Sequence, residues 1–553
     1  DGALITILTN NLSVAGTLTV GQGTSGTFDT NSKNLTVSGT TTVAAGATLN
    51  LDAGSAPSAL TISSTLTNNG TVTVESTLGG TASIIGSGAV RTFTGTDINY
   101  NTNSVTLTNI DYDPDVLLDQ AGDTIVLGDA NCVFDGISIG IAGVISTFNA
   151  GAYNFMLSGN FTNTATGVFT STGTVTFDGA SAQTITSGGT GVGKNFNNVI
   201  LDNNTINLTA VVSNPFNIGG TLVIASGHMP TITTNSNNLN VAGTTNGVVA
   251  GAESLTITGS GILTFTGAVG SVYALGTLTI TNSNGATFQS TVNCATLTIT
   301  DTADSQTVAF QGNLTVTVGM SAAANGAYNV SLLGANNSIA GSTTFGNTGS
   351  VTIGTTGGTS AFIAGVTHTN GITYLNGIIS TTNSQINFNA ITLSSNTTLD
   401  TNATTTAGDI TIGAVTGAGN NLTIETGYSI TGADVSGTSI TNIGTLTLQN
   451  IGGTALFTGI LATINTISAN NTAVNVSLTG NGNIVTSSFS PDNTGTLTLG
   501  ILGGTQTYNT GINTTGTDGI VTLNGTINTS DDVITLGAVT LGSAVTLDTN
   551  ATT

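Results

Sequence analysis

The chain has 553 residues and a formal net charge of −23, with 3 Lys and Arg against 26 Asp and Glu. Nucleic-acid binding needs basic side chains that displace counterions from phosphates, and the sequence beyond Lys194 contains neither Lys nor Arg. The composition therefore excludes nucleic acid as a partner. No segment supplies about 18 consecutive apolar residues, so we also expect no membrane span.

The first predicted elements repeat one another. Residues 11–20 read NLSVAGTLTV and residues 34–43 read NLTVSGTTTV, which places Leu35 23 residues after Leu12, and a looser copy begins at Ala59. Apolar residues alternate with Thr or Ser in each copy, as in a short, half-buried β-strand. Gly and Asn residues between these runs tolerate positive φ and allow tight turns.

A unit of this length cannot bury its own apolar face, but stacked copies can bury one another's. The sequence therefore predicts an all-β fold, a right-handed parallel β-solenoid (β-helix) with coils of ~23 residues and roughly 24 coils in all. The alternative is a series of tandem β-sandwich (Ig-like) domains of about 100 residues each. Sandwiches would repeat at domain length, so the short repeat favours the solenoid.

Solenoid coils are predicted over residues 1–96, and an irregular interruption containing Pro114 and many Asp residues over residues 97–150. Within it, alternate Asp residues could converge on a hard cation that prefers oxygen ligands. The candidate Ca²⁺ ligands are Asp111, Asp113, Asp115 and Asp119. An EF-hand loop would need Gly and Glu where this chain has Val116 and Gly122, so a solvated acidic loop is the alternative. No other cofactor is expected.

The solenoid is predicted to continue over residues 151–553, with a join near residues 213–230, where Pro215 and Pro230 cannot donate to a sheet ladder. Cys132 and Cys294 would lie several coils apart, too far for a disulfide, so we expect two buried, unpaired thiols. A longer repeat pairs residues 442–457 with residues 493–508 near the end of the sequence.

No catalytic residues are predicted. The three Glu residues are far apart, no Ser–His–Asp motif is recognisable, and His228 and His368 would lie on different coils. We therefore expect a protein that is not an enzyme. Two alternatives stay open: a polysaccharide-acting β-helix enzyme, and an ice- or glycan-binding module with Thr side chains in file.

Several segments carry a resemblance to a known class of proteins. Residues 159–162 read GNFT, residues 172–177 TGTVTF, residues 195–200 NFNNVI and residues 261–269 GILTFTGAV. This pattern resembles the repeats of large secreted bacterial surface proteins, namely filamentous-haemagglutinin-like and autotransporter-passenger-like adhesins and repeat-built surface-layer proteins. The resemblance covers most of the chain and is one of composition.

The resemblance implies an extracellular or cell-surface protein. We expect a rigid stalk or a self-assembling fibre, sheath or layer, with adhesion as its role. The expected partners are copies of itself, or surface glycans and other cells. The segment LDTNATT at residues 547–553 also occurs at residues 399–405, where the chain continues, so we expect a longer parent chain or a homopolymer.

Overall fold

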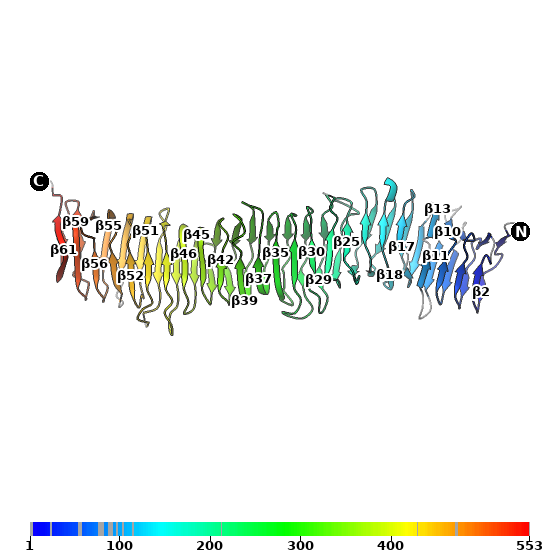
Figure 1. The fold of residues 1–553 in the computed structure, drawn as a ribbon, viewed down its shortest axis with the longest axis horizontal. Helices are drawn as coiled ribbons and strands as arrows, with labels where there is room; N and C mark the ends of the chain where they lie inside the picture. The colour runs from blue at the N-terminus through cyan, green and yellow to red at the C-terminus, as the bar shows by residue number, and fades with distance from the viewer. Residues whose placement is uncertain are drawn as a thin grey trace. The chain divides into compact units, whose positions relative to one another are not determined.

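The computed structural model describes residues 4–22, 25–52, 58–75, 82–86, 92–95, 98–101, 104–112, 115–211, 213–428, 430–469 and 474–551. These residues form parallel stacked strands in a β-solenoid of about 22 turns with ~23-residue spacing. The chain divides into two compact units, Asp1–Leu275 (unit 1) and Gly276–Thr553 (unit 2). Within each unit the strands stack turn upon turn (Figure 1). The predicted solenoid is confirmed.

Unit 1 has three strands in a turn, and most of these strands pair in parallel with the equivalent strand of a neighbouring turn. Side 1 contains β2 (Leu12–Val14), β5 (Leu35–Val37), β8 (Ser58–Ile62), β11 (Ala82–Gly86), β14 (Ser104–Thr108), β17 (Thr124–Leu127), β20 (Thr147–Gly151), β23 (Val168–Ser171), β28 (Phe216–Ile218), β31 (Leu239–Val241) and β34 (Leu263–Phe265). Side 2 contains β3 (Leu18–Val20), β6 (Thr41–Val43), β9 (Leu66–Asn68), β12 (Thr92–Gly95), β15 (Asp111–Tyr112), β18 (Cys132–Phe134), β21 (Phe155–Leu157), β24 (Thr174–Phe177), β26 (Asn198–Leu201), β29 (Leu222–Ile224) and β32 (Thr245–Asn246). Side 3 contains β1 (Leu4–Ile7), β4 (Gly26–Asp29), β7 (Thr48–Asp52), β10 (Thr71–Glu75) and β13 (Ile98–Asn101), and then β16 (Val116–Leu118), β19 (Ile137–Ile139), β22 (Phe161–Asn163), β25 (Gln183–Thr186), β27 (Thr205–Leu208), β30 (Thr231–Thr233) and β33 (Leu255–Thr258).

The first repeat of the sequence is one turn of this solenoid. Leu12 pairs with Leu35 in the β2–β5 ladder, and Leu35 pairs in turn with Leu60. A Cβ atom on Gly39 would lie 2.7 Å from the carbonyl carbon of Gly16, which explains the glycine at position 39. Apolar residues of these strands, such as Leu35 and Leu60, are fully buried. The inward file of apolar side chains follows directly from the alternation in the sequence.

The described residues of 97–150, for which the sequence predicts an irregular interruption, contribute strands β13 to β20 and a short 3-10 turn at Ile141–Gly143. From β14 onward these strands pair in parallel with the next turn, as in β14–β17 and β17–β20. Residues 213–230, the predicted join, contain β28 and β29, which pair with β31 and β32. The division between the two compact units falls after Leu275.

Unit 2 has longer strands that continue around corners of the turn. Its strands are β35 (Leu275–Thr281, at the division), β36 (Ala286–Phe288), β37 (Val292–Ile299), β38 (Thr307–Phe310), β39 (Leu314–Ala322), β40 (Asn329–Leu332), β41 (Asn336–Ile339), β42 (Thr343–Phe345), β43 (Val351–Ile353), β44 (Thr359–Phe362), β45 (Val366–Ser380), β46 (Ile386–Asp400), β47 (Ile410–Ile412), β48 (Val415–Thr416), β49 (Leu422–Glu425), β50 (Val435–Gly437), β51 (Ile440–Leu448), β52 (Thr454–Phe457), β53 (Leu461–Ala469), β54 (Asn475–Leu478), β55 (Asn483–Pro491), β56 (Leu497–Leu499), β57 (Thr505–Tyr508), β58 (Ile512–Asn513), β59 (Val521–Thr529), β60 (Ile534–Thr535) and β61 (Val539–Asp548). We call side A the side of β36, β38, β40 and β43, side B that of β41, β44 and β49, and side C that of β42, β47, β50, β52, β54 and β56.

The second repeat of the sequence does not return to the same side. Leu446, in the first copy, pairs with Leu422 on side B. Its counterpart in the second copy, Leu497, pairs with Val476 on side C. Both Leu446 and Leu497 are fully buried. The sides of a turn are thus interchangeable in sequence, because each needs only an inward apolar pair and an outward polar residue.

Asparagine has a recurrent structural role outside the core. An Asn side chain just before a strand accepts, through Oδ1, the backbone N–H of the equivalent residue one turn later. Such contacts join Asn34 to Ala59 at 3.1 Å, Asn160 to Thr184 at 2.7 Å and Asn313 to Asn336 at 3.0 Å. We call this contact the Asn staple. It explains the recurrent Asn-Leu-Thr triplet as a staple, an inward Leu and an outward Thr.

Candidate functional site

The predicted calcium ligands lie on neighbouring strands and loops of unit 1. Asp111 begins β15 and is half-buried, while Asp115 and Asp119 are exposed on either side of β16. Asp113 lies outside the described residues. Among the residues that the structure does describe, no group of three or more His, Cys, Asp or Glu side chains is placed to hold a metal ion. The calcium site stays a prediction.

Asp123, just before β17, is the buried acid of this region. Its side chain is fully buried, and Oδ2 accepts the N–H of Gln120 at 3.0 Å. Its other oxygen, Oδ1, has no hydrogen-bond partner among the described residues. Burial raises the pKa of Asp123 to about 6, with a smaller contribution from the Asp119 carboxylate. The side chain is therefore a neutral acid below that pH, when its proton reduces the cost of burial.

A row of polar residues that the sequence analysis missed runs along one edge of side 2 in unit 1. Asp135, Ser158, Asp178 and Asp202 each directly follow a strand of this side, and we call them the acid edge. The last residues of those strands are in register, since Phe134 pairs with Leu157, Leu157 with Phe177 and Phe177 with Leu201. These residues are 20 or more positions apart in the chain, and the fold brings them together one turn apart.

Hydrogen bonds connect parts of the acid edge. The Ser158 hydroxyl donates to Asp178 Oδ1 at 3.1 Å, and His228 Nε2 lies 2.9 Å from Asp202 Oδ1. Burial is the main cause that raises the pKa of Asp178; the Ser158 hydrogen bond lowers it, and the nearby Asp202 charge raises it further. Asp178 and Asp202 thus form a pair of carboxylates one turn apart.

Lys194 is the buried cation of unit 1, with 8% of its surface exposed. Its Nζ donates to the carbonyl oxygens of Thr164 and Gly167, both at 2.5 Å, and to Asn163 Oδ1 at 3.5 Å. Burial lowers its pKa. The three hydrogens of an ammonium group match these three oxygens, so Lys194 closes a corner of the turn rather than presenting a charge to a ligand.

His368 on β45 is fully buried in unit 2. Its Nε2 lies 3.3 Å from the carbonyl oxygen of Asn347, and its Nδ1 lies 2.9 Å from the Thr373 hydroxyl. A carbonyl only accepts, so Nε2 carries the hydrogen and Nδ1 accepts from Thr373. Burial lowers the pKa of His368. The ring is a neutral, satisfied part of the core in register with Phe345 and Phe388.

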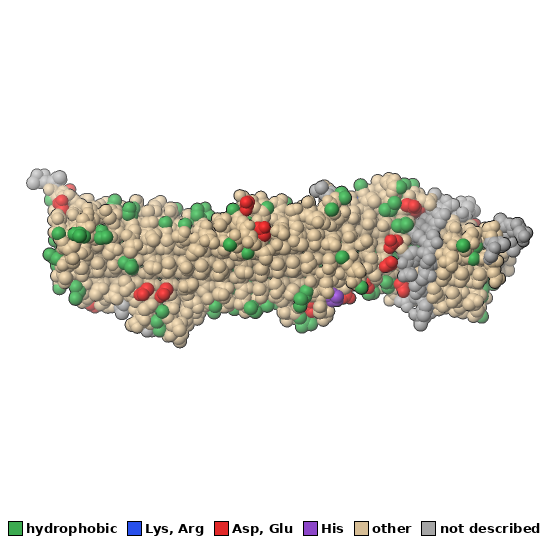
Figure 2. Space-filling view, viewed as in Figure 1, with side chains coloured by type: hydrophobic (Ala, Val, Ile, Leu, Met, Phe, Trp, Pro, Cys, Tyr) green, Lys and Arg blue, Asp and Glu red, His purple; other side chains and the backbone are tan. Residues whose placement is uncertain are grey.

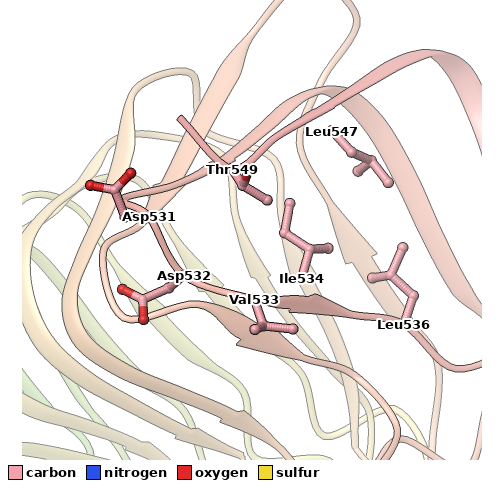
Figure 3. A pocket seen from close by; sticks show the side chains of 7 residues that line it. All are labelled: Asp531, Asp532, Val533, Ile534, Leu536, Leu547 and Thr549. Atoms are coloured by element: carbon pink, nitrogen blue, oxygen red, sulfur yellow. The ribbon is translucent and has the colours of Figure 1, made fainter. Parts of the chain in front are cut away.

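A hollow of about 540 Å³ lies on the last described turn of unit 2. Figure 3 shows its lining, which combines the acidic Asp531 and Asp532 with apolar Val533, Ile534, Leu536 and Leu547 and with Thr549. Leu547 pairs with Ile527, which the following strand buries completely, whereas Leu547 itself is 48% exposed. Leu547 therefore lines the hollow at a position that is buried in the preceding turn.

A second hollow, of about 650 Å³, lies on side B of unit 2. Its lining comes from successive turns and includes Ile378, Asn396, Thr398, Asn421 and Thr423. Uncharged polar groups also dominate the wider surface: the face in Figure 2 shows scattered Asp and Glu among uncharged side chains and backbone, and no Lys or Arg. This hollow can offer hydrogen bonds to a ligand but no positive charge.

Comparisons with known proteins give no match: no family model, no curated protein and no solved structure resembles this chain significantly. Across the described ranges, no helix is long and apolar enough to pass through a membrane. The fold thus defines a β-solenoid repeat protein.

Proposed function

We propose that this chain is an extracellular, non-enzymatic structural protein of a bacterial surface. It serves as a rigid stalk or as the unit of a self-assembling fibre, sheath or layer, with adhesion as its role. One observation carries the proposal: within each unit, inward apolar residues and parallel ladders repeat turn after turn. Such ladders resist bending and local opening because every turn is held by both of its neighbours.

The charge pattern supports an exposed, durable location. The chain has only 3 Lys and Arg residues, and Lys194 is buried, so proteases that cut after basic residues find few sites. Asn staples add a side-chain bond between turns outside the core, as between Asn475 and Thr496 at 2.8 Å. Both features suit a protein that must last outside the cell.

Electron microscopy of the native cell surface, with gold-labelled antibodies against unit 2, tests this proposal. We expect label on projecting rods, fibres or an ordered layer. Label confined to the cytoplasm, or spread over soluble material without any ordered structure, would contradict it. Projecting single rods would select the stalk, and ordered fibres or lattices the self-assembling form.

The acid edge favours a second candidate, a polysaccharide-acting β-helix enzyme. Asp178 and Asp202 follow strands that lie one turn apart, about 5 Å in a parallel ladder, and the two carboxyl groups of a retaining glycosidase are also about 5 Å apart. Release of reducing ends from neutral polysaccharides, lost in Asp178→Asn, would support it. No release by the unchanged protein from a broad polysaccharide panel would exclude it.

A further inference from the structure

We propose that the hollow on side B of unit 2 binds a neutral glycan chain, an inference that rests on the proposed adhesive function and names its ligand class. The hollow of about 650 Å³ crosses several turns, so it presents the same kinds of side chain repeatedly along the stack. Adjacent turns lie about 4.8 Å apart, which suits a ligand that itself repeats.

Two asparagines give the hollow fixed hydrogen-bond donors. Asn396 Oδ1 accepts the N–H of Asn421 at 3.0 Å, and Asn421 Oδ1 accepts the N–H of Thr445 at 2.8 Å. These staples fix the orientation of each amide, and both side chains are exposed. Neither Nδ2 group donates to another described residue, so each retains hydrogens for a ligand. A donor that is already oriented loses little entropy when it binds.

Hydroxyl groups and one apolar side chain complete the lining. Thr398 and Thr423 are partners in the ladder, and each lies two residues after one of the stapled asparagines, on the same side of the sheet. Ile378, the ladder partner of Thr398, is 41% exposed. A sugar ring presents both hydroxyl groups and a C–H face, and this lining offers a partner for each.

Charge and backbone pairing exclude other ligands. Asp400 and Glu425, the next outward residues of the same two strands, are acidic, and unit 2 contains no Lys or Arg, so an anionic polymer would be repelled. An added peptide strand would need free backbone groups, but β46 and β49 are paired in ladders along this side. A neutral polyhydroxyl chain is not repelled by these carboxylates and needs no free backbone groups.

Isothermal titration of the whole chain with cellohexaose, chitohexaose and mannohexaose, and with an oligogalacturonate as the anionic control, tests the proposal. We expect binding of at least one neutral hexaose and none of the oligogalacturonate. Asn421→Ala should weaken that binding about tenfold or more, because it removes a fixed donor. Thr423→Val, which keeps the shape but removes the hydroxyl, should also weaken it.

Asn475→Ala is the matched control, since it breaks an equivalent staple on side C and leaves the hollow intact. It should bind the glycan as the unchanged protein does. Equal weakening by Asn421→Ala and Asn475→Ala would overturn the assignment of the site. Failure of all three neutral hexaoses to bind, or peptide mapping of the native chain by mass spectrometry that finds a glycan already attached at Asn421, would overturn the inference.

The glycan-binding experiment and the electron microscopy of the cell surface test the two proposals independently. Rods or fibres on the cell surface together with no glycan binding would remove only the inference about the hollow. Glycan binding by a protein found solely in the cytoplasm would remove the proposed function and leave the binding site in place.

Discussion

The two units share parallel ladders but fill their cores differently. In unit 1, aromatic rings follow one another through the core; Phe196, for example, lies 4.9 Å from Phe161 and 5.3 Å from Phe216 between ring centroids. Among the described residues of unit 2, aromatic rings meet in smaller groups, such as Phe345 with Phe362 at 6.5 Å and with His368 at 6.2 Å between ring centroids. Unit 1 also buries the ionisable Asp123 and Lys194, whereas unit 2 buries the neutral His368.

This difference shows which part of the sequence specifies the fold. Aromatic, aliphatic and even polar side chains occupy inward positions, and the ladders on both sides of them keep their register. The alternation of inward and outward residues, together with turn residues at the corners, is therefore enough to form a turn. The identity of the inward residue sets how stable that turn is. The predictions below test this separation.

The largest effect is expected from the aromatic run of unit 1. Phe196→Ala removes a side chain that is 1% exposed and in contact with several rings, and should cost about 5 kcal/mol of unfolding free energy. Phe457→Ala, at a fully buried position of unit 2, should lower the free energy of unfolding by about 3 kcal/mol. Hydrogen exchange of the amides around each substituted residue measures both losses of stability. Equal losses would show that the aromatic run adds nothing beyond burial.

Lys194→Met should destabilise unit 1 by about 2–3 kcal/mol, because it leaves the buried carbonyl oxygen of Gly167 without a donor and leaves that of Thr164 with only the N–H of Gly167. Lys33→Met, at a half-buried position, is the control and should change stability by less than about 0.5 kcal/mol. Denaturant unfolding followed by circular dichroism provides the comparison. A neutral Lys194→Met would contradict the role of Lys194 in closing the corner.

Asp123 should make unit 1 more stable in acid. Its pKa is about 6 when folded and about 3.9 when unfolded, so the folded state binds more protons between these values. The contribution is fully present below pH about 4 and is lost as the pH rises through about 6, on the order of 3 kcal/mol. Asp123→Asn should abolish this dependence in amides around β17. If the stability of Asp123→Asn still falls as the pH rises from 4 to 6, another titratable group is responsible for the pH dependence.

His368 should give unit 2 the opposite dependence. Because burial lowers its pKa when folded, the unfolded state takes up the proton first as the pH falls below about 6.5. Stability is therefore present above that pH and is lost as the pH falls through the folded-state pKa. After correction for the intrinsic exchange rate, the protection of amides near β45 should fall between pH 7 and 5 in the unchanged protein but not in His368→Gln. Protection near β45 that instead increases as the pH falls would show that the ring is already charged in the folded core.

The two units are expected to differ least in the reactivity of their cysteines, since each unit contains one buried thiol. Both are buried and free, and burial raises the pKa of Cys132 to about 11 and that of Cys294 to about 12. Neither thiol should react with iodoacetamide at pH 8 in the folded protein, and both should react in denaturant. Mass spectrometry counts the modified thiols. Rapid labelling of one cysteine in the folded state would reveal local opening of that unit.

Much of the fold follows from the sequence, while the sites do not. The alternation and the 23-residue repeat predict the Leu12–Leu35 ladder because one copy corresponds to one turn. The longer repeat gives no such pairing, since its copies place Leu446 and Leu497 on different sides. The acid edge escapes detection because its members are separated by a whole turn of chain. The buried, unpaired thiols are confirmed.

Cross-linking tests the stacking of turns most directly. Thr423 and Thr447 are ladder partners on side B, so cysteines introduced at both should form a disulfide under mild oxidation. Thr447 and Thr498 occupy matching positions of the longer sequence repeat but lie on different sides, so cysteines there should stay reduced. Mass spectrometry of non-reduced peptides distinguishes the outcomes. A Thr447–Thr498 cross-link without the Thr423–Thr447 one would contradict the register of the solenoid.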